Sequence, residues 1–189
     1  MQLAIEHLRE DLWVFGYGSL IWRPDFDYLE RAPARLIGAR RALCVFSHVH
    51  RGTPERPGLV LGLDLGGACR GVAYRVAAKK RADTIAYLRA REQATSVYRE
   101  TLRSVTLLGE PERRVSALVY MIDRGHVQYA GRLDLAQQLH LVRQGHGQSG
   151  PNREYVLSTV HALEALGLRD RDLHRLAEKL KGSHEGTAA

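Results

Sequence analysis

A glutamate in a helical segment is the first residue whose type and position suggest chemistry. Glu92 follows Leu88 by four positions and Ile85 by seven, so an α-helix places all three on one face. A carboxylate on an apolar face is costly to bury without a partner, and desolvation raises its pKa. Glu92 is therefore a candidate general acid–base near neutral pH. The alternative is structural: a cation such as Arg89 or Arg91 pairs with it, or the helix end exposes it to water.

A glycine-flanked turn near the N-terminus is the second candidate. The stretch 12–20 reads LWVFGYGSL: four apolar residues, typical of a strand buried on both faces, run into Gly-Tyr-Gly-Ser. The two glycines let the backbone bend sharply and approach another group closely. Backbone N–H groups in such a turn form a concave patch that can hold an anion or a developing oxyanion. Residues 16–20 are thus a candidate binding site, and the alternative is a tight turn that binds nothing.

Three familiar motifs do not fit this turn. A dinucleotide-binding GxGxxG motif needs glycine at the position of Ile21, and Pro24 would break the helix that must follow. A GxSxG nucleophile elbow needs glycines two positions on either side of Ser19, where Tyr17 and Ile21 stand. A Walker A loop lacks its Gly-Lys-Ser/Thr end. The turn is therefore not a nucleotide or acyl-serine site of these types.

Composition is that of an ordinary globular protein. The chain has 189 residues, 44% hydrophobic and 26% charged, which suits one domain with a substantial core. The net charge of +7 permits an anionic partner, but the basic residues are scattered, which argues against nucleic-acid binding. No segment approaches the ~20 apolar residues of a membrane-spanning helix, and the N-terminus lacks the apolar core of a signal peptide. We expect a cytoplasmic protein without membrane insertion.

The cysteines and histidines do not predict a metal site. Cys44 and Cys69 are far apart and neither belongs to a CxxC motif, so neither a zinc ribbon nor a disulfide framework is supported. His48 and His50 follow Cys44 but lack the further ligands that a structural zinc site needs. We expect both cysteines to be reduced and structural.

Apolar periodicity predicts the elements that must position the candidate residues. A helix is predicted over 79–93, and the predicted strands cover 34–46, 59–63, 69–76, 99–108 and 115–122, besides the opening strand. Turn residues predict two hairpins, joined through Asp64–Ala68 and Gly109–Glu112. This order favours an α+β fold, in which helices pack outside a mixed, largely antiparallel sheet or small barrel.

The last third of the chain is predicted to be helical. One helix ends at Gly145, another starts near Ser149–Asn152, and Asp170 is expected to cap a third. We expect a single domain over residues 1–182 and a flexible tail over 183–189.

Several other polar residues have open roles. The loop 50–54 is either a polar rim of a pocket or an ordinary surface loop with a solvated arginine. Tyr98, Tyr120 and Tyr129 each either donate a hydroxyl hydrogen bond or fill core space. Tyr120 is expected in the core because it lies inside a predicted strand.

Read in order, five segments resemble the ChaC-like γ-glutamylcyclotransferases, over about residues 12–166. They are WVFGYGSLIW (13–22), HRG with PG (50–52 and 57–58), GVAYR (71–75), YLRARE (87–92) and SGPNREY (149–155). The resemblance implies a small mixed β-barrel with flanking helices. It also implies an enzyme that cleaves glutathione into 5-oxoproline and Cys-Gly, with no metal or cofactor. The α-amine of the γ-glutamyl group would attack its own γ-carbonyl.

The family's roles can be placed on this sequence residue by residue. Glu92 corresponds to the acid–base residue, and the turn would hold the γ-glutamyl group. The implied substrate-binding residues are Phe15, Gly16, Tyr17, Gly18, Ser19, Leu20 and Tyr129.

Two departures from the family pattern bear on substrate preference. Residues 94–98 read ATSVY, where many members have a glycine-rich step into tyrosine, and 43–49 lack a tryptophan and an aspartate often found there. Cyclisation of other γ-glutamyl amines or peptides is therefore an alternative. A non-catalytic protein on the same scaffold, linked to cation transport, is another, although the presence of Glu92 argues for an enzyme.

Overall fold

The computed structural model describes residues 9–92 and 96–182. By packing, the chain divides into two compact units, which are described separately below. The first unit comprises the described residues of Met1–Ala42 and Gly62–His126, and the second those of Leu43–Leu61 and Val127–Ala189. The single domain expected over residues 1–182 stays a prediction, and the predicted tail, 183–189, lies outside the described residues.

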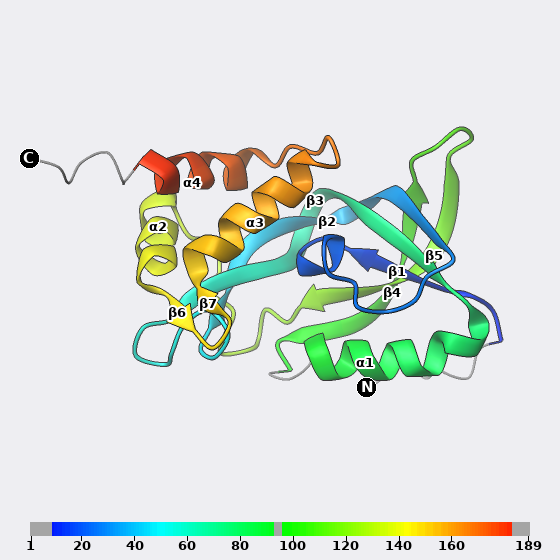
Figure 1. The fold of residues 1–189 in the computed structure, drawn as a ribbon, viewed down its shortest axis with the longest axis horizontal. Helices are drawn as coiled ribbons and strands as arrows, with labels where there is room; N and C mark the ends of the chain where they lie inside the picture. The colour runs from blue at the N-terminus through cyan, green and yellow to red at the C-terminus, as the bar shows by residue number, and fades with distance from the viewer. Residues whose placement is uncertain (1–8, 93–95, 183–189) are drawn as a thin grey trace, which may run out of the picture. The chain divides into compact units, whose positions relative to one another are not determined.

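Five long strands form a closed β-barrel in the order β1-β3-β2-β4-β5 (Figure 1). Their bounds are β1 Leu12–Gly16, β2 Glu30–Ser47, β3 Gly58–Val76, β4 Tyr98–Leu107 and β5 Arg113–Ile122. The β1–β3, β2–β4 and β4–β5 pairs are antiparallel, whereas β1 and β5 run parallel and close the barrel. This confirms the predicted α+β fold with a small mixed barrel.

The predicted hairpin through Asp64–Ala68 is wrong. Residues 58–76 form one continuous strand, β3, in which Gly66 and Gly67 have φ values of +93° and +74°. Such backbone conformations are accessible to glycine, and glycines at these positions let a long strand bend as a barrel closes. The same two glycines therefore mark a bend within a strand. The second predicted hairpin is confirmed, because β4 and β5 pair along their whole length.

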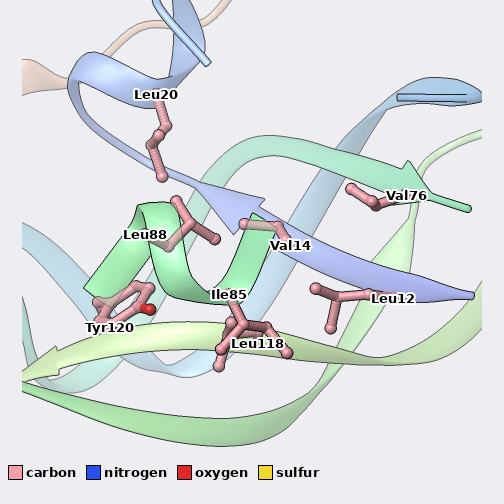
Figure 2. Packing of buried hydrophobic residues seen from close by; sticks show 8 residues of the cluster. All are labelled: Leu12, Val14, Leu20, Val76, Ile85, Leu88, Leu118 and Tyr120. Atoms are coloured by element: carbon pink, nitrogen blue, oxygen red, sulfur yellow. The ribbon is translucent and has the colours of Figure 1, made fainter. Parts of the chain in front are cut away.

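The helix that carries Glu92 packs on the first unit's core. A short 3₁₀ helix, η2 (Ala78–Lys80), leads into α1 (Arg81–Glu92). Ile85 and Leu88 are buried against side chains of β1 and β5, as Figure 2 shows. Fully burying such a side chain contributes about 1.5–3 kcal/mol, so the apolar face fixes how α1 is rotated about its axis. Glu92, one turn beyond Leu88, follows that face.

The second unit contains three helices that pack on one another: α2 (Leu135–Gln144), α3 (Asn152–Glu164) and α4 (Arg171–Lys181) (Figure 1). It also holds a two-stranded ribbon of β6 (His146–Gly147) and β7 (Gly150–Pro151). The helix ends confirm the sequence signals. The side chain of Asp170 accepts a hydrogen bond from the N–H of Leu173, and α2 ends immediately before Gly145.

Cys44 and Cys69 are buried and not disulfide-bonded, as expected. Across residues 9–92 and 96–182, no group of three or more histidine, cysteine or acidic side chains is placed to hold a metal ion. None of the helices within the same ranges is long and apolar enough to cross a membrane.

Candidate active site

Close packing of two strands shapes the start of the predicted turn. A Cβ added to Gly71 of β3 would overlap the carbonyl oxygen of Gly16 at the end of β1. A Cβ at Gly16 would itself lie 3.1 Å from the Cβ of Leu20. Gly71 has no room for a side chain, and at Gly16 a side chain would fit only if Leu20 shifted slightly. Both glycines therefore allow the chain to fold back immediately after β1, and Leu20 to enter the core cluster shown in Figure 2.

The turn itself is a short 3₁₀ helix, η1 (Ser19–Ile21), whose carbonyl groups are held in place. The Tyr74 hydroxyl donates to the carbonyls of Leu20 (2.9 Å) and Ile21 (3.1 Å), and Arg41 Nε donates to the carbonyl of Tyr17 (2.6 Å). The N–H of Ile21 donates to Gly18 (2.9 Å).

The N–H groups of this turn are left as available donors. Those of Gly18, Ser19 and Leu20 have no protein acceptor within the described ranges. Unpaired N–H groups at a helix start favour an anion. The turn therefore offers backbone donors, and its role in binding stays a prediction.

Glu92 ends α1 with a side chain that is only 17% exposed. Burial raises the pKa of its carboxyl group, and the positive charge of Arg91 opposes this shift without cancelling it. The Nε of Arg91 lies 3.3 Å from Oε1 of Glu92. Glu92 is therefore paired with a cation and yet has a raised pKa, and its role as an acid–base residue stays a prediction.

Arg91 connects Glu92 to the turn, a role that the sequence interpretation missed. Its guanidinium donates to the Ser19 hydroxyl (2.9 Å), to the carbonyl of Arg23 (2.7 Å) and to the Tyr87 hydroxyl (2.7 Å). One side chain therefore joins the end of α1 to the start of η1 and to the segment that follows it. The adjacency of Arg91 and Glu92 in the sequence was the available signal, but it predicted only an ion pair.

The predicted substrate-binding residues divide into backbone and side-chain candidates. Phe15, Tyr17 and Leu20 have buried side chains, so only their backbone groups can face a ligand. Ser19 presents both its N–H and a hydroxyl that is held by Arg91. Tyr129 belongs to the second unit, where it bridges Val45, and its substrate-binding role stays a prediction. Tyr120 is in the core, as expected.

The loop 50–54 has a structural role in the second unit. Arg51 donates to the carbonyls of Ser149 (2.5 Å) and Pro151 (3.2 Å), and its guanidinium lies 5.5 Å from the centre of the Tyr155 ring. The HRG segment therefore packs against the SGPN segment. This contact accounts for Arg51 better than a solvated surface loop does.

A buried asparagine extends the same contact to β3. Asn152 is fully buried, and its side chain accepts from the N–H of Leu59 (2.6 Å) and donates to the carbonyl of the same residue (2.7 Å). Two of the five segments that resemble the family, 50–52 with 57–58 and 149–155, therefore meet in one place.

The fold matches solved γ-glutamylcyclotransferases. A crystal structure of the glutathione-specific γ-glutamylcyclotransferase from yeast superposes with a TM-score of 0.84 at 25% identity, covering 95% of this chain and all of that one. The fold class is thus that of the γ-glutamylcyclotransferases.

Sequence comparison identifies the family. The glutathione-specific γ-glutamylcyclotransferase of Escherichia coli is 33% identical over 90% of this chain and 73% of its own length. The human glutathione-specific γ-glutamylcyclotransferase 1 is 33% identical over 88% of this chain and 76% of its own. γ-Glutamylcyclotransferase 2-3 of Arabidopsis thaliana is 32% identical over 90% of this chain and 88% of its own length. The family model described as ChaC-like protein matches residues 12–183, and the chain belongs to this family.

Proposed function

We propose that the protein is a glutathione-specific γ-glutamylcyclotransferase, which converts glutathione to 5-oxo-L-proline and L-cysteinylglycine. The observation that carries the proposal is the buried Glu92 carboxylate, joined through Arg91 to the open donors of the turn. The names of the relatives from Escherichia coli and human support the substrate.

The reaction needs few protein groups because the substrate carries its own nucleophile. The α-amine of the γ-glutamyl group attacks the γ-carbonyl carbon, and a C–N bond closes a five-membered lactam. The amide bond to cysteine then breaks, and its nitrogen leaves as the amine of Cys-Gly. Holding the substrate in a ring-ready shape supplies the proximity contribution, which for well-oriented intramolecular reactions reaches roughly 7–11 kcal/mol.

Glu92 moves the protons in this scheme. Its carboxylate takes a proton from the α-ammonium group, which frees the lone pair for attack, and returns it to the departing nitrogen as the amide C–N bond breaks. The attacking nitrogen loses a second proton as the lactam forms, and Glu92 passes this proton to the amine of Cys-Gly, which leaves as an ammonium group. A carboxyl group with a raised pKa is the stronger base for the first step and remains an acid for the second. Both transfers are proton transfers within one site, so the scheme uses no cofactor.

The turn binds the charged end of the substrate. The N–H groups of Gly18, Ser19 and Leu20 are donors for the α-carboxylate or for the oxyanion that forms at the γ-carbonyl. Arg91 keeps the Ser19 hydroxyl beside the end of α1, so this part of the substrate lies within reach of Glu92. Substrate and product are small molecules, and no nucleic acid takes part.

The cytoplasm is the proposed site of action. Glutathione keeps thiols reduced there, and two buried cysteines without a disulfide suit that compartment.

Other γ-glutamyl compounds are the second candidate substrates. The Arabidopsis thaliana relative is named a γ-glutamylcyclotransferase without reference to glutathione. Comparing glutathione with γ-Glu-Cys and γ-Glu-Ala under the same conditions separates the two possibilities. A glutathione-specific enzyme will release 5-oxoproline from the tripeptide alone.

The test of function compares two charge-neutral substitutions. Purified wild type, Glu92→Gln and Glu178→Gln are incubated with glutathione, and 5-oxoproline is measured. Loss of a general acid–base costs typically ~100-fold to 10,000-fold, so Glu92→Gln should fall by at least about 100-fold. Glu178 lies exposed on α4 and is the matched control, which should retain wild-type activity. Equal background from wild type and Glu92→Gln would sink the enzyme proposal and favour the binding-protein alternative.

A further inference from the structure

A second buried carboxylate lies on the barrel, and both it and Glu92 are close enough to Tyr120 to raise the pKa of that tyrosine. The side chain of Glu100 on β4 is 3% exposed and accepts two hydrogen bonds from Arg89 of α1, at 2.9 and 2.8 Å. The Tyr120 hydroxyl, opposite Glu100 in the β4–β5 register, donates to it at 3.4 Å. Two parallel N–H···O bonds between guanidinium and carboxylate are the strongest form of ion pair, so Arg89 is held in one orientation.

Helix geometry makes this pairing relevant to Glu92. Residues three apart on a helix are neighbours, with Cβ atoms about 5–6 Å apart, so Arg89 lies within side-chain reach of Glu92. Its guanidinium nevertheless bonds across to β4. A carboxylate flanked by two guanidinium groups would be a weak base.

We propose that Glu100 is a positioning residue for the reaction, because it holds Arg89 against the barrel and keeps that guanidinium off the Glu92 carboxylate. The same ion pair anchors the last turn of α1, which carries Glu92, to β4. This inference rests on the proposed function, since it assigns Glu100 a task in the chemistry of Glu92.

The charges around Glu92 determine what each substitution should do. On its own helix are Arg91, at 3.3 Å, and Arg89. From the barrel come Glu100 on β4 and Tyr120 on β5, and the pKa of the tyrosine is raised by burial and by the charges of Glu100 and then Glu92. Asp25, after η1, faces Arg91 at 3.5 Å. Removing one member of the Arg89–Glu100 pair leaves the other's charge uncompensated in the buried region around Tyr120, on which Glu100 and Glu92 both act.

The two single substitutions should therefore act in opposite directions. Glu100→Gln frees Arg89 to pair with Glu92, so the acidic limb of the kcat/KM profile with glutathione should move to lower pH by about one unit, and kcat should fall. Arg89→Gln leaves the Glu100 carboxylate unopposed, so the limb should move to higher pH by a similar amount. The Arg89→Gln/Glu100→Gln double variant restores charge balance, and its limb should return close to that of wild type.

The same three variants also include a control for loss of folding. The double variant buries no uncompensated charge and should fold even where a single variant does not. An NMR titration of the Glu92 carboxyl group, assigned by its loss in Glu92→Gln, should show the same opposite shifts without relying on turnover.

The outcomes separate this inference from the proposed function. A positioning role is supported if the two single variants shift the acidic limb in opposite directions and the double variant returns it to the wild-type position. Suppose that the wild type is active. If the single variants lose kcat while the acidic limb stays in place, or if both single variants shift the limb and the Glu92 titration in the same direction, the pair only stabilises the fold. An inactive wild type would overturn the proposed function, while the Glu92 titrations would still test the charge arrangement. If the singles fail to fold, a double variant whose Glu92 titrates well away from its wild-type position also overturns the inference.

Discussion

Within residues 9–92 and 96–182, Glu92 combines burial with a single close cation, Arg91, and these two features act on its pKa in opposite directions. A carboxylate on an apolar helix face would be neutralised by two neighbouring arginines. Here Arg89 is directed to Glu100, and Arg91 divides its donors among Ser19, Tyr87 and the backbone as well as Glu92. The carboxyl pKa therefore remains raised. At this scale, reactivity depends on where each guanidinium is held rather than on how many arginines are near.

The raised pKa of Glu92 predicts a cost in stability at neutral pH. The folded protein holds this proton more tightly than the unfolded chain, whose glutamates titrate near ~4.3, so stability falls as pH rises from there through the folded pKa. Glu92→Gln removes that cost. Its Tm should exceed that of wild type at pH 7–8, and the difference should shrink towards pH 4.

Thermal unfolding of both proteins between pH 4 and 8 checks this expectation, with Glu178→Gln as control. A Tm difference that stays constant across the range would show that desolvation of the Glu92 charge is not the cause.

At the scale of elements, the site depends on how closely β1 approaches β3. The end of β1 packs backbone to backbone on Gly71, and Tyr74 of the same strand holds the carbonyls of η1. The apolar face of α1 also packs on β1 and β5, and this packing brings Arg91 to Ser19. The turn and Glu92 are thus positioned by neighbouring packed elements of the first unit.

Gly71→Ala tests this approach of the strands. The added methyl group would overlap the Gly16 carbonyl and displace β1, at a cost of about 1–3 kcal/mol in the free energy of unfolding. Activity should fall with it, because the turn moves with β1. Gly109→Ala is the matched control, since its Cβ meets nothing within 4 Å.

Urea unfolding and 5-oxoproline release, measured on both variants, provide the comparison. A Gly71→Ala protein as stable and as active as Gly109→Ala would show that the close approach is not required.

For the molecule as a whole, charge balance determines the response to acid. The chain carries +7 at neutral pH, with 21 acidic residues against 28 lysines and arginines. Asp64 shows how some carboxylates stabilise the fold: burial acts to raise its pKa, but hydrogen bonds from Arg124 and Leu65 and the charges of Arg124 and Arg40 outweigh burial and lower it. Its contribution is present above the unfolded pKa and is lost as pH falls through the folded one.

We therefore expect the free energy of unfolding to decrease steadily below about pH 4, the ordinary range of carboxylates. Protonation removes ion pairs such as Asp64–Arg40 and increases the positive charge, which adds repulsion. Asp64→Asn should be less stable than wild type at pH 7 and should lose less stability on acidification. Urea midpoints from pH 7 to 3 measure both proteins, and parallel curves would contradict the expected role of Asp64.

Much of the architecture could be predicted because local signals agreed with the final packing. The apolar face of α1, the β4–β5 hairpin and the Asp170 cap were each predicted from residues within one segment. The error at Asp64–Ala68 has a physical reason. Paired glycines allow either a turn or a bend within a strand, and barrel closure, which depends on distant strands, selects the bend.

The sequence by itself determined the chemical groups: a glutamate on an apolar helix face, a turn with free backbone donors and a cation beside the glutamate. Tertiary structure alone decided which arginine contacts Glu92 and which other groups each arginine contacts. Arg89 finds its partner on β4, and Arg91 finds Ser19, 72 positions away along the chain. Helical spacing would favour Arg89, three positions before the glutamate, over the adjacent Arg91, which is the reverse of the pairing found. Only the packing of α1 on the barrel supplies the competing acceptors that direct them to different partners.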